Sequence, residues 1–155
     1  MRLVVNTKGS KYIVEDKKSR LLYTVKKKGF GKKYILLDSS EYNLYTFAED
    51  VVDRKPRFDI ILNDRTFLRL ECMSLFLDPT INAENDKMKY SIKSKDRKSF
   101  QIILNGEKVG SIETLLTVGG DLQYDIDIED KCFDDYIPLF AVAIDRAFGD
   151  INKKK

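Results

Sequence analysis

The sequence predicts a mostly β domain, in which a closed antiparallel barrel of about twelve strands encloses a hydrophobic C-terminal α-helix. Residues 122–129 alternate apolar and polar side chains without a slip, which is the pattern of a half-buried strand. Residues 134–149 break this alternation with a run that is apolar on every side. Many hairpins avoid exposed sheet edges by closing into a barrel, and a helix without a polar face must be surrounded.

The strands are expected to follow one another as hairpins, ten to twelve in all. Two apolar runs flank Asn105-Gly106, a pair that tolerates the positive φ of a tight hairpin turn. A loose repeat of strand, turn and strand recurs every 22 to 24 residues in the first half of the chain. Aromatic residues occupy matching strand positions, and we predict that they lie in the core: Tyr12, Tyr34, Phe58 and Tyr124.

Residues 134–149, which break the alternation, carry residues typical of the start and the end of a helix. Asp134 or Asp135 can cap its N-terminus, Pro138 suits the first turn, and Gly149 suits a C-terminal stop. The uncharged stretch 136–144 is shorter than the about 20 residues that a membrane-spanning helix needs. Burial of the large side chains of the segment would contribute about 9–18 kcal/mol before entropy is counted. That is comparable to the net stability of a whole domain, so the sheet is expected to depend on this helix.

The end of the chain also resembles a known family. The segment 140–148, after an Asp-Ile-Asp-Ile strand, is similar to the C-terminal signature of the Tubby-like superfamily, and most of all to LURP-one-related proteins and phospholipid scramblases. The hairpins extend the likeness over most of residues 10–149. The resemblance implies a barrel of about twelve strands around one hydrophobic helix. The acylated cysteine-rich and proline-rich regions of scramblases are missing, so the resemblance is to short stand-alone members and lipid scrambling is not implied.

Length and composition bound the organisation of the chain. With 155 residues, the chain is expected to form one domain over residues 1–150, followed by a disordered basic tail over 151–155. The first residues form too short an apolar run for a signal peptide, so we expect a cytoplasmic protein with two reduced cysteines, Cys72 and Cys132. The net charge of +3 hides blocks of opposite sign: residues 1–38 carry eleven Lys and Arg against three acids, and residues 120–150 carry nine acids against two bases.

The residues argue against catalysis. The chain has no histidine, which removes the commonest general base near neutral pH and every Ser-His or Cys-His arrangement. It also has no phosphate-binding loop of the Walker type and no Cys-x-x-Cys metal spacing. We therefore expect a binding or interaction domain without enzymatic activity, cofactor or metal.

A lysine-rich tract is the sharpest surface feature of the sequence. Its Lys-Gly-Phe-Gly core matches the start of an RNA-recognition strand motif, but the next positions hold lysines where aromatic and aliphatic residues are needed, and no nucleic-acid partner is expected. The tract could bind an anionic, phosphoinositide-like membrane surface, since each lysine gains about 1 kcal/mol near acidic headgroups. The resemblance supports this, because Tubby-like domains that bind phosphoinositides use basic surface residues. The candidate residues are Lys26, Lys27, Lys28, Phe30, Lys32 and Lys33.

Alternatives remain open for each polar feature. The lysine tract could be a solvated hairpin that protects a strand edge, and the whole domain could be a scaffold that binds a protein partner. Asp125, Asp127 and Glu129 project from one face of a strand, where salt bridges are favoured over a calcium site, because a straight strand spreads these carboxylates apart. Asp145, the acid on the helix, must be paired if it faces the interior, and a structural pin near the barrel mouth is favoured over a functional acid.

Overall fold

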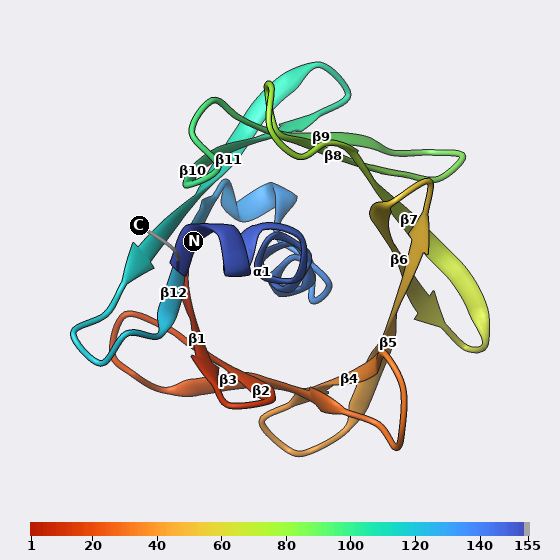
Figure 1. Ribbon diagram of the computed structural model, residues 1–155. Helices are drawn as coiled ribbons and strands as arrows, with labels where there is room; N and C mark the ends of the chain where they lie inside the picture. Colours follow the sequence, from red (N-terminus) through yellow and green to blue (C-terminus); the bar gives the residue numbers. More distant parts are fainter. Residues whose placement is uncertain (154–155) are drawn as a thin grey trace.

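Twelve strands form one closed barrel around a helix. Figure 1 shows the computed structural model of the chain, which describes residues 1–153, with the helix α1 lying inside the ring of strands. Each strand pairs antiparallel with its sequence neighbours, and β1 pairs with β12 to close the ring. The predicted fold class is therefore confirmed. The strands are β1 (Arg2–Lys8), β2 (Lys11–Glu15), β3 (Leu21–Lys27), β4 (Lys33–Asp38), β5 (Asn43–Val52), β6 (Lys55–Leu62), β7 (Arg65–Ser74), β8 (Thr80–Glu84), β9 (Lys89–Ser94), β10 (Ser99–Leu104), β11 (Glu107–Leu116) and β12 (Leu122–Ile128).

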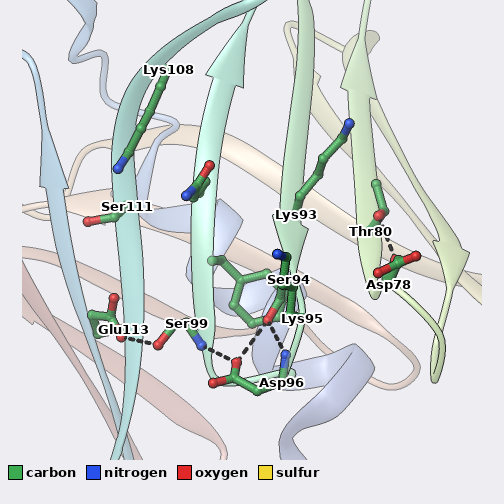
Figure 2. Close-up of a pocket in the computed structure, with 12 residues that line it drawn as sticks. Asp78, Thr80, Lys93, Ser94, Lys95, Asp96, Ser99, Lys108, Ser111 and Glu113 are labelled. Carbon is green, nitrogen blue, oxygen red and sulfur yellow. Dashed lines mark hydrogen bonds between the residues drawn. The ribbon is translucent and has the colours of Figure 1, made fainter.

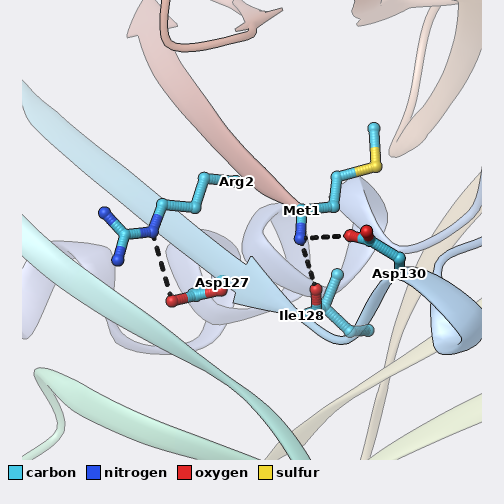
Figure 3. A network of polar contacts seen from close by, with 5 residues as sticks. All are labelled: Met1, Arg2, Asp127, Ile128 and Asp130. Carbon is cyan, nitrogen blue, oxygen red and sulfur yellow. Dashed lines mark hydrogen bonds and ion pairs between the residues drawn. The ribbon is translucent and has the colours of Figure 1, made fainter.

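The closing seam between β1 and β12 carries a small polar network (Figure 3). The ammonium group of Met1 donates to the carbonyl of Ile128 at 2.7 Å and to Oδ1 of Asp130 at 2.7 Å. Arg2 Nε lies 3.3 Å from Asp127 Oδ2 on the same seam. The hydrogen bond from the ammonium group lowers the pKa of Asp130. The two ion pairs are exposed to water, so they fix the register of the seam more than they stabilise it.

The turn chemistry predicted from the sequence is present. Asn105 and Gly106 connect β10 to β11 with φ values of 50° and 89°, the positive values of a tight hairpin turn. The turn between β5 and β6 uses the same conformation at Asp53 and Arg54, with φ values of 51° and 66°. Short turns of this kind keep every strand beside its sequence neighbour and produce the meander.

The alternating residues place one face of each strand in the core. In β12, Leu122, Tyr124, Ile126 and Ile128 are all buried, while Asp127 between them is exposed. The four aromatic residues predicted from the repeat are also buried, between 0% and 5% exposed: Tyr12, Tyr34, Phe58 and Tyr124.

The helix α1 (Pro138–Lys153) supplies the other half of the core, after a short 3-10 helix η1 (Asp130–Cys132). Every residue from Leu139 to Ile144 is completely buried. The Phe140 ring lies with its centroid 4.9 Å from that of Tyr90, and the Phe148 and Phe100 centroids are 5.5 Å apart. The helix has no polar face along most of its length, and the surrounding strands remove its apolar surface from water.

Both ends of the helix differ from the prediction. The helix begins at Pro138 and not at the predicted caps, because Asp134 accepts the Asp135 N–H while Asp135 accepts the Tyr23 hydroxyl. At the other end it runs through Gly149 to Lys153. Gly149 is buried in the helix, where an added Cβ would lie 2.8 Å from Asp145 Oδ1. The absence of a side chain at Gly149 lets the Asp145 carboxylate lie close to the helix backbone, and the residue does not end the helix.

The predicted disordered tail, 151–155, is accordingly wrong in its first three residues. Ile151, Asn152 and Lys153 form the last turn of α1, and the Asn152 amide donates to the carbonyl of Arg97 at 2.7 Å. This contact attaches the end of the helix to the turn between β9 and β10. Residues 154–155 lie outside the described part of the chain.

Within residues 1–153, neither the length nor the hydropathy of any helix suffices for it to cross a membrane.

Candidate functional site

The barrel has two rims of different composition. Since consecutive strands are antiparallel, the turn that follows each odd-numbered strand lies at one end of the barrel, and the turn that follows each even-numbered strand lies at the other. We call the first end the basic rim, formed by residues 8–11, 27–33, 52–55, 74–80, 94–99 and 116–122. We call the second the acidic rim, formed by residues 15–21, 38–43, 62–65, 84–89, 104–107 and 128–138.

The formal charges of the two rims have opposite signs. The basic rim holds eleven Lys and Arg against four Asp, a net charge of +7. The acidic rim holds twelve Asp and Glu against seven Lys and Arg, a net charge of −5. The near-neutral total of the chain therefore conceals a separation of charge along the barrel axis. Such a separation orients the molecule in front of a charged surface.

The lysine-rich tract belongs to the basic rim. Strand β3 ends at Lys27 and β4 begins at Lys33, and the turn between them is closed by the Lys28 N–H, which donates to the Lys33 carbonyl at 2.9 Å. Phe30 at its tip is fully exposed, with a relative accessibility of 105%. The hairpin predicted from the sequence is thus present with its aromatic tip in solvent.

The lysines of the tract do not share one face. Lys26 follows the buried Val25 and pairs in register with Ile35, so it projects from the outer wall of the barrel. Lys27 has the opposite phase and lines a pocket at the barrel mouth. Lys32 lies 3.8 Å from the carboxylate of Glu49, which is itself largely buried. Lys28 and Lys33 are exposed on the rim, and among the described residues neither has an ion-pair partner.

The pocket at the mouth lies beside the last turns of α1. It has a volume of about 350 Å³, and Arg146 is the cation in it that is held most firmly. Arg146 Nε donates to Glu49 Oε1 at 2.6 Å, and the guanidinium group lies 5.9 Å from the centroid of the Tyr34 ring. The hydrogen bond to Glu49 raises the pKa of Arg146. Two further cations, Lys27 and Lys153, line the same pocket.

Asp145 at the base of this pocket is a structural acid. Its carboxylate accepts the Tyr12 hydroxyl at 2.6 Å and the Tyr124 hydroxyl at 2.7 Å. Burial, followed by the charge of Asp145, raises the pKa of both phenols, so they remain neutral donors. The acid thereby connects α1 to β2 and β12. This is the pin near the barrel mouth that the sequence favours.

A larger hollow, about 690 Å³, lies on the outer wall over β8–β11 and reaches the basic rim (Figure 2). Two of its three acids, Asp96 and Glu113, are engaged in local structure. Asp96 accepts the backbone N–H groups of Lys98 and Ser99 at 2.9 Å each, which lower its pKa, and Glu113 accepts the Ser99 hydroxyl at 2.5 Å. Its lysines, Lys93, Lys95 and Lys108, form no ion pair among residues 1–153. The hollow therefore presents three lysine ammonium groups without an ion pair beside two carboxylates that already accept hydrogen bonds.

The acidic strand is engaged in the same way. Asp127 pairs with Arg2, Glu129 lies 3.7 Å from Lys131, and Asp125 accepts the side-chain amide of Gln123 at 3.0 Å. Over the described part of the chain, no group of three or more acidic, cysteine or histidine side chains gathers as a metal site would require.

Sequence reasoning placed one turn of the basic rim in the candidate site, and it recognised the basic blocks over residues 1–38 and 87–98 without assigning them to that site. The structure adds Lys8 and Lys11 from the first turn and Lys95 and Lys98 from the fifth. These residues are far apart in the sequence, so their charges appear unrelated until the strand order is known. In an up-and-down barrel alternate turns share one end, and adding charges over alternate turns would have revealed the asymmetry.

Comparisons with known proteins agree with this architecture. A solved structure of a protein from Arabidopsis thaliana matches with a TM-score of 0.65 and 15% sequence identity, covering 97% of this chain and 90% of that chain. At this identity the match shows a common fold alone. No curated protein sequence matches the chain. The family model described as LURP-one-related matches residues 1–145, which include the whole barrel and the first half of α1. The chain therefore belongs to the LURP-one-related family.

Proposed function

We propose that this chain is a non-enzymatic binding domain that attaches reversibly to anionic phospholipid surfaces through its basic rim. The observation that carries the proposal is the charge separation between the two rims, +7 against −5. A barrel with this polarity approaches an acidic membrane with one end first. The location that suits such a protein is the cytoplasmic surface of a membrane, as a peripheral protein.

The lysine-rich hairpin is one contributor to this rim. Lys28 and Lys33 project into solvent beside Phe30, so their charges are available to headgroups. Lys32 is partly neutralised by Glu49, and Lys26 faces the side of the barrel. Each lysine near an anionic surface contributes about 1 kcal/mol, so several turns acting together are needed for stable attachment. The rim, with eleven cations, supplies that number.

The absence of catalysis is part of the proposal, and the side chains support it. The chain has no histidine, and each carboxylate oxygen of Asp145 accepts a hydrogen bond from a tyrosine hydroxyl. In the outer-wall hollow, Asp96 and Glu113 are committed to turn and strand contacts. A general acid or base needs a free carboxyl that can reach a substrate, and these are not free.

The test compares two charge reversals that change the net charge equally. Lys28→Glu with Lys33→Glu alters the basic rim, and Lys17→Glu with Lys18→Glu alters the acidic rim. Binding to sedimenting vesicles of phosphatidylcholine, with and without phosphatidylserine, is measured at 0.05 M and 0.5 M salt. The basic-rim variant should bind acidic vesicles about thirtyfold more weakly or worse, since about 2 kcal/mol of attraction is lost and repulsion is added. The acidic-rim variant should bind like the wild type or more weakly by only a small factor.

Equal binding to neutral and acidic vesicles, or equal loss in both variants, would contradict the proposal. Absence of vesicle binding, together with a stoichiometric protein partner whose binding survives the Lys28 and Lys33 reversal, would instead favour the alternative of a protein-interaction scaffold.

A further inference from the structure

Exposed apolar side chains gather on the same rim as the cations. Thirteen large hydrophobic residues are exposed among residues 1–153, and nine of them lie in the turns of the basic rim or in the strand residues next to these turns. The acidic rim and its vicinity hold the other four. The nine are Phe30, Val51, Val52, Met73, Phe76, Leu77, Leu115, Leu116 and Val118.

The most exposed of these residues occupy the tips of separate turns. Phe30 and Val118 are fully exposed, Leu77 is 85% exposed and Phe76 is 66% exposed. They come from the β3–β4, β11–β12 and β7–β8 turns, so they are distributed around the ring of strands in Figure 1. Because each tip stands apart from the core, none is needed to fill the barrel. A set of separate apolar tips at one end suits a broad, flat partner better than a narrow groove.

Cations stand beside the apolar tips of the β3–β4 and β7–β8 turns. The guanidinium group of Arg97 lies 5.8 Å from the centroid of the Phe76 ring, and Lys55 Nζ donates to the Met73 carbonyl at 3.1 Å. The β3–β4 turn places Phe30 between lysines. Apolar tips flanked by cations match the chemistry of an acidic bilayer, where acyl chains lie beneath anionic headgroups.

A second copy joined through the same rim does not match this chemistry. Joining two basic rims would bring a net charge of +7 against an equal charge, and like charges opposed in this way disfavour association. The charge of the rim therefore disfavours a symmetric dimer and favours an anionic surface, and the flat array of apolar tips favours a bilayer as that surface.

We propose that the barrel stands end-on at an acidic bilayer and inserts the tips of the β3–β4, β7–β8 and β11–β12 turns below the headgroups. The inference rests on the function proposed above and adds to it an apolar component and an orientation, with the acidic rim turned toward water. The attachment would then have two parts: an electrostatic part that salt screens, and an apolar part that salt leaves in place.

The chain contains no tryptophan, so a single inserted tryptophan reports on its own surroundings. We would prepare Phe30→Trp and Phe76→Trp on the basic rim and Tyr42→Trp as a matched control, since Tyr42 is an exposed aromatic residue, 69% exposed, on the acidic rim. Each variant is mixed with phosphatidylcholine–phosphatidylserine vesicles, and quenching by lipids brominated on their acyl chains is measured. The two basic-rim tryptophans should show blue-shifted emission and strong quenching, and the control should show neither.

A second pair of variants measures the apolar part directly. Phe76→Ser with Leu77→Ser should weaken vesicle binding about tenfold or more, whereas Leu21→Ser with Leu62→Ser, two exposed residues on the acidic rim, should leave it unchanged. The loss should persist at high salt, where lysine contributions are screened. The folded state of each variant is verified by circular dichroism.

The outcomes separate this inference from the function on which it rests. If the protein binds acidic vesicles but no rim tryptophan is quenched, attachment is purely electrostatic and the insertion is wrong while the proposed function stands. If the protein binds no vesicle, both fail. If the emission shifts with protein concentration alone, without lipid, the tips contact a second copy and the insertion is again wrong.

Discussion

Replacing Phe140 with alanine tests whether the helix holds the barrel together. Phe140 is completely buried, and its ring lies 4.9 Å from Tyr90 and 5.8 Å from Tyr136 between centroids. Truncating such a phenylalanine removes its transfer free energy and leaves a cavity that its neighbours fill only in part, which costs about 3–5 kcal/mol. A domain of this size has a free energy of unfolding of about 5–15 kcal/mol, so the loss is a large part of the total.

The measurement is urea denaturation followed by circular dichroism, with Phe30→Ala as the control. Phe30 is the same residue type but fully exposed, so its truncation should change the free energy of unfolding by no more than about 0.5 kcal/mol. Phe140→Ala should lower the urea midpoint with little change in slope, and should lower the melting temperature by roughly 6–20 °C. A loss below about 1 kcal/mol, or the same loss in both variants, would refute the reasoning that α1 is enclosed.

Three further predictions concern the barrel mouth and the core. Gly149→Ala should lower the free energy of unfolding by about 1 kcal/mol despite the better helix propensity of alanine, because the new Cβ would displace Asp145 from its hydrogen bonds with Tyr12 and Tyr124. Chemical denaturation measures this change, and a more stable variant would contradict the prediction. The pKa values of Tyr12 and Tyr124 are raised in the folded state, so the stability that these phenols contribute is complete below pH 10 and is lost above it, where the tyrosines of the unfolded chain ionise. The free energy of unfolding should fall by up to about 1.4 kcal/mol per pH unit for each tyrosine. Denaturation between pH 9 and 11 measures this fall, and a flat profile would oppose the prediction. Burial raises the pKa of the Cys72 thiol to about 11. At pH 8, maleimide should therefore label the half-buried Cys132 first and Cys72 only after unfolding. Equal labelling rates of the two cysteines in the native protein would be inconsistent with a buried Cys72 thiol.

The fold could be predicted because its signals are local. Alternation along residues 122–129, the Asn105-Gly106 turn and the apolar helix each specify their own segment, and together they leave few architectures. The ends of the helix could not be predicted in the same way. Gly149 looks like a helix stop in the sequence, but its role is the close approach of Asp145, which only the packed structure reveals.

The candidate site could be predicted only in part, because charge patterning depends on strand order. The lysine hairpin is contiguous in sequence and was found, whereas the cations of the other turns join it only after the barrel closes. The direction in which each lysine of the tract points was the second difficulty. Lys26 and Lys27 are neighbours in the sequence, but Lys26 projects from the outer wall and Lys27 lines the pocket at the barrel mouth. The tips Phe76, Leu77 and Val118 carry no sequence pattern, since an exposed apolar residue in a turn looks like any core residue.

Chemical footprinting of every lysine in one experiment tests the proposed orientation of the barrel at a bilayer most directly. Acetylation is followed by mass spectrometry in the presence and absence of phosphatidylserine vesicles, with neutral vesicles as the reference. Lys28, Lys33 and Lys98 on the basic rim should be protected severalfold by acidic vesicles, while Lys17 and Lys87 on the acidic rim should react at unchanged rates. Equal protection at both rims, or protection confined to the acidic rim, would show that the charge separation does not direct binding.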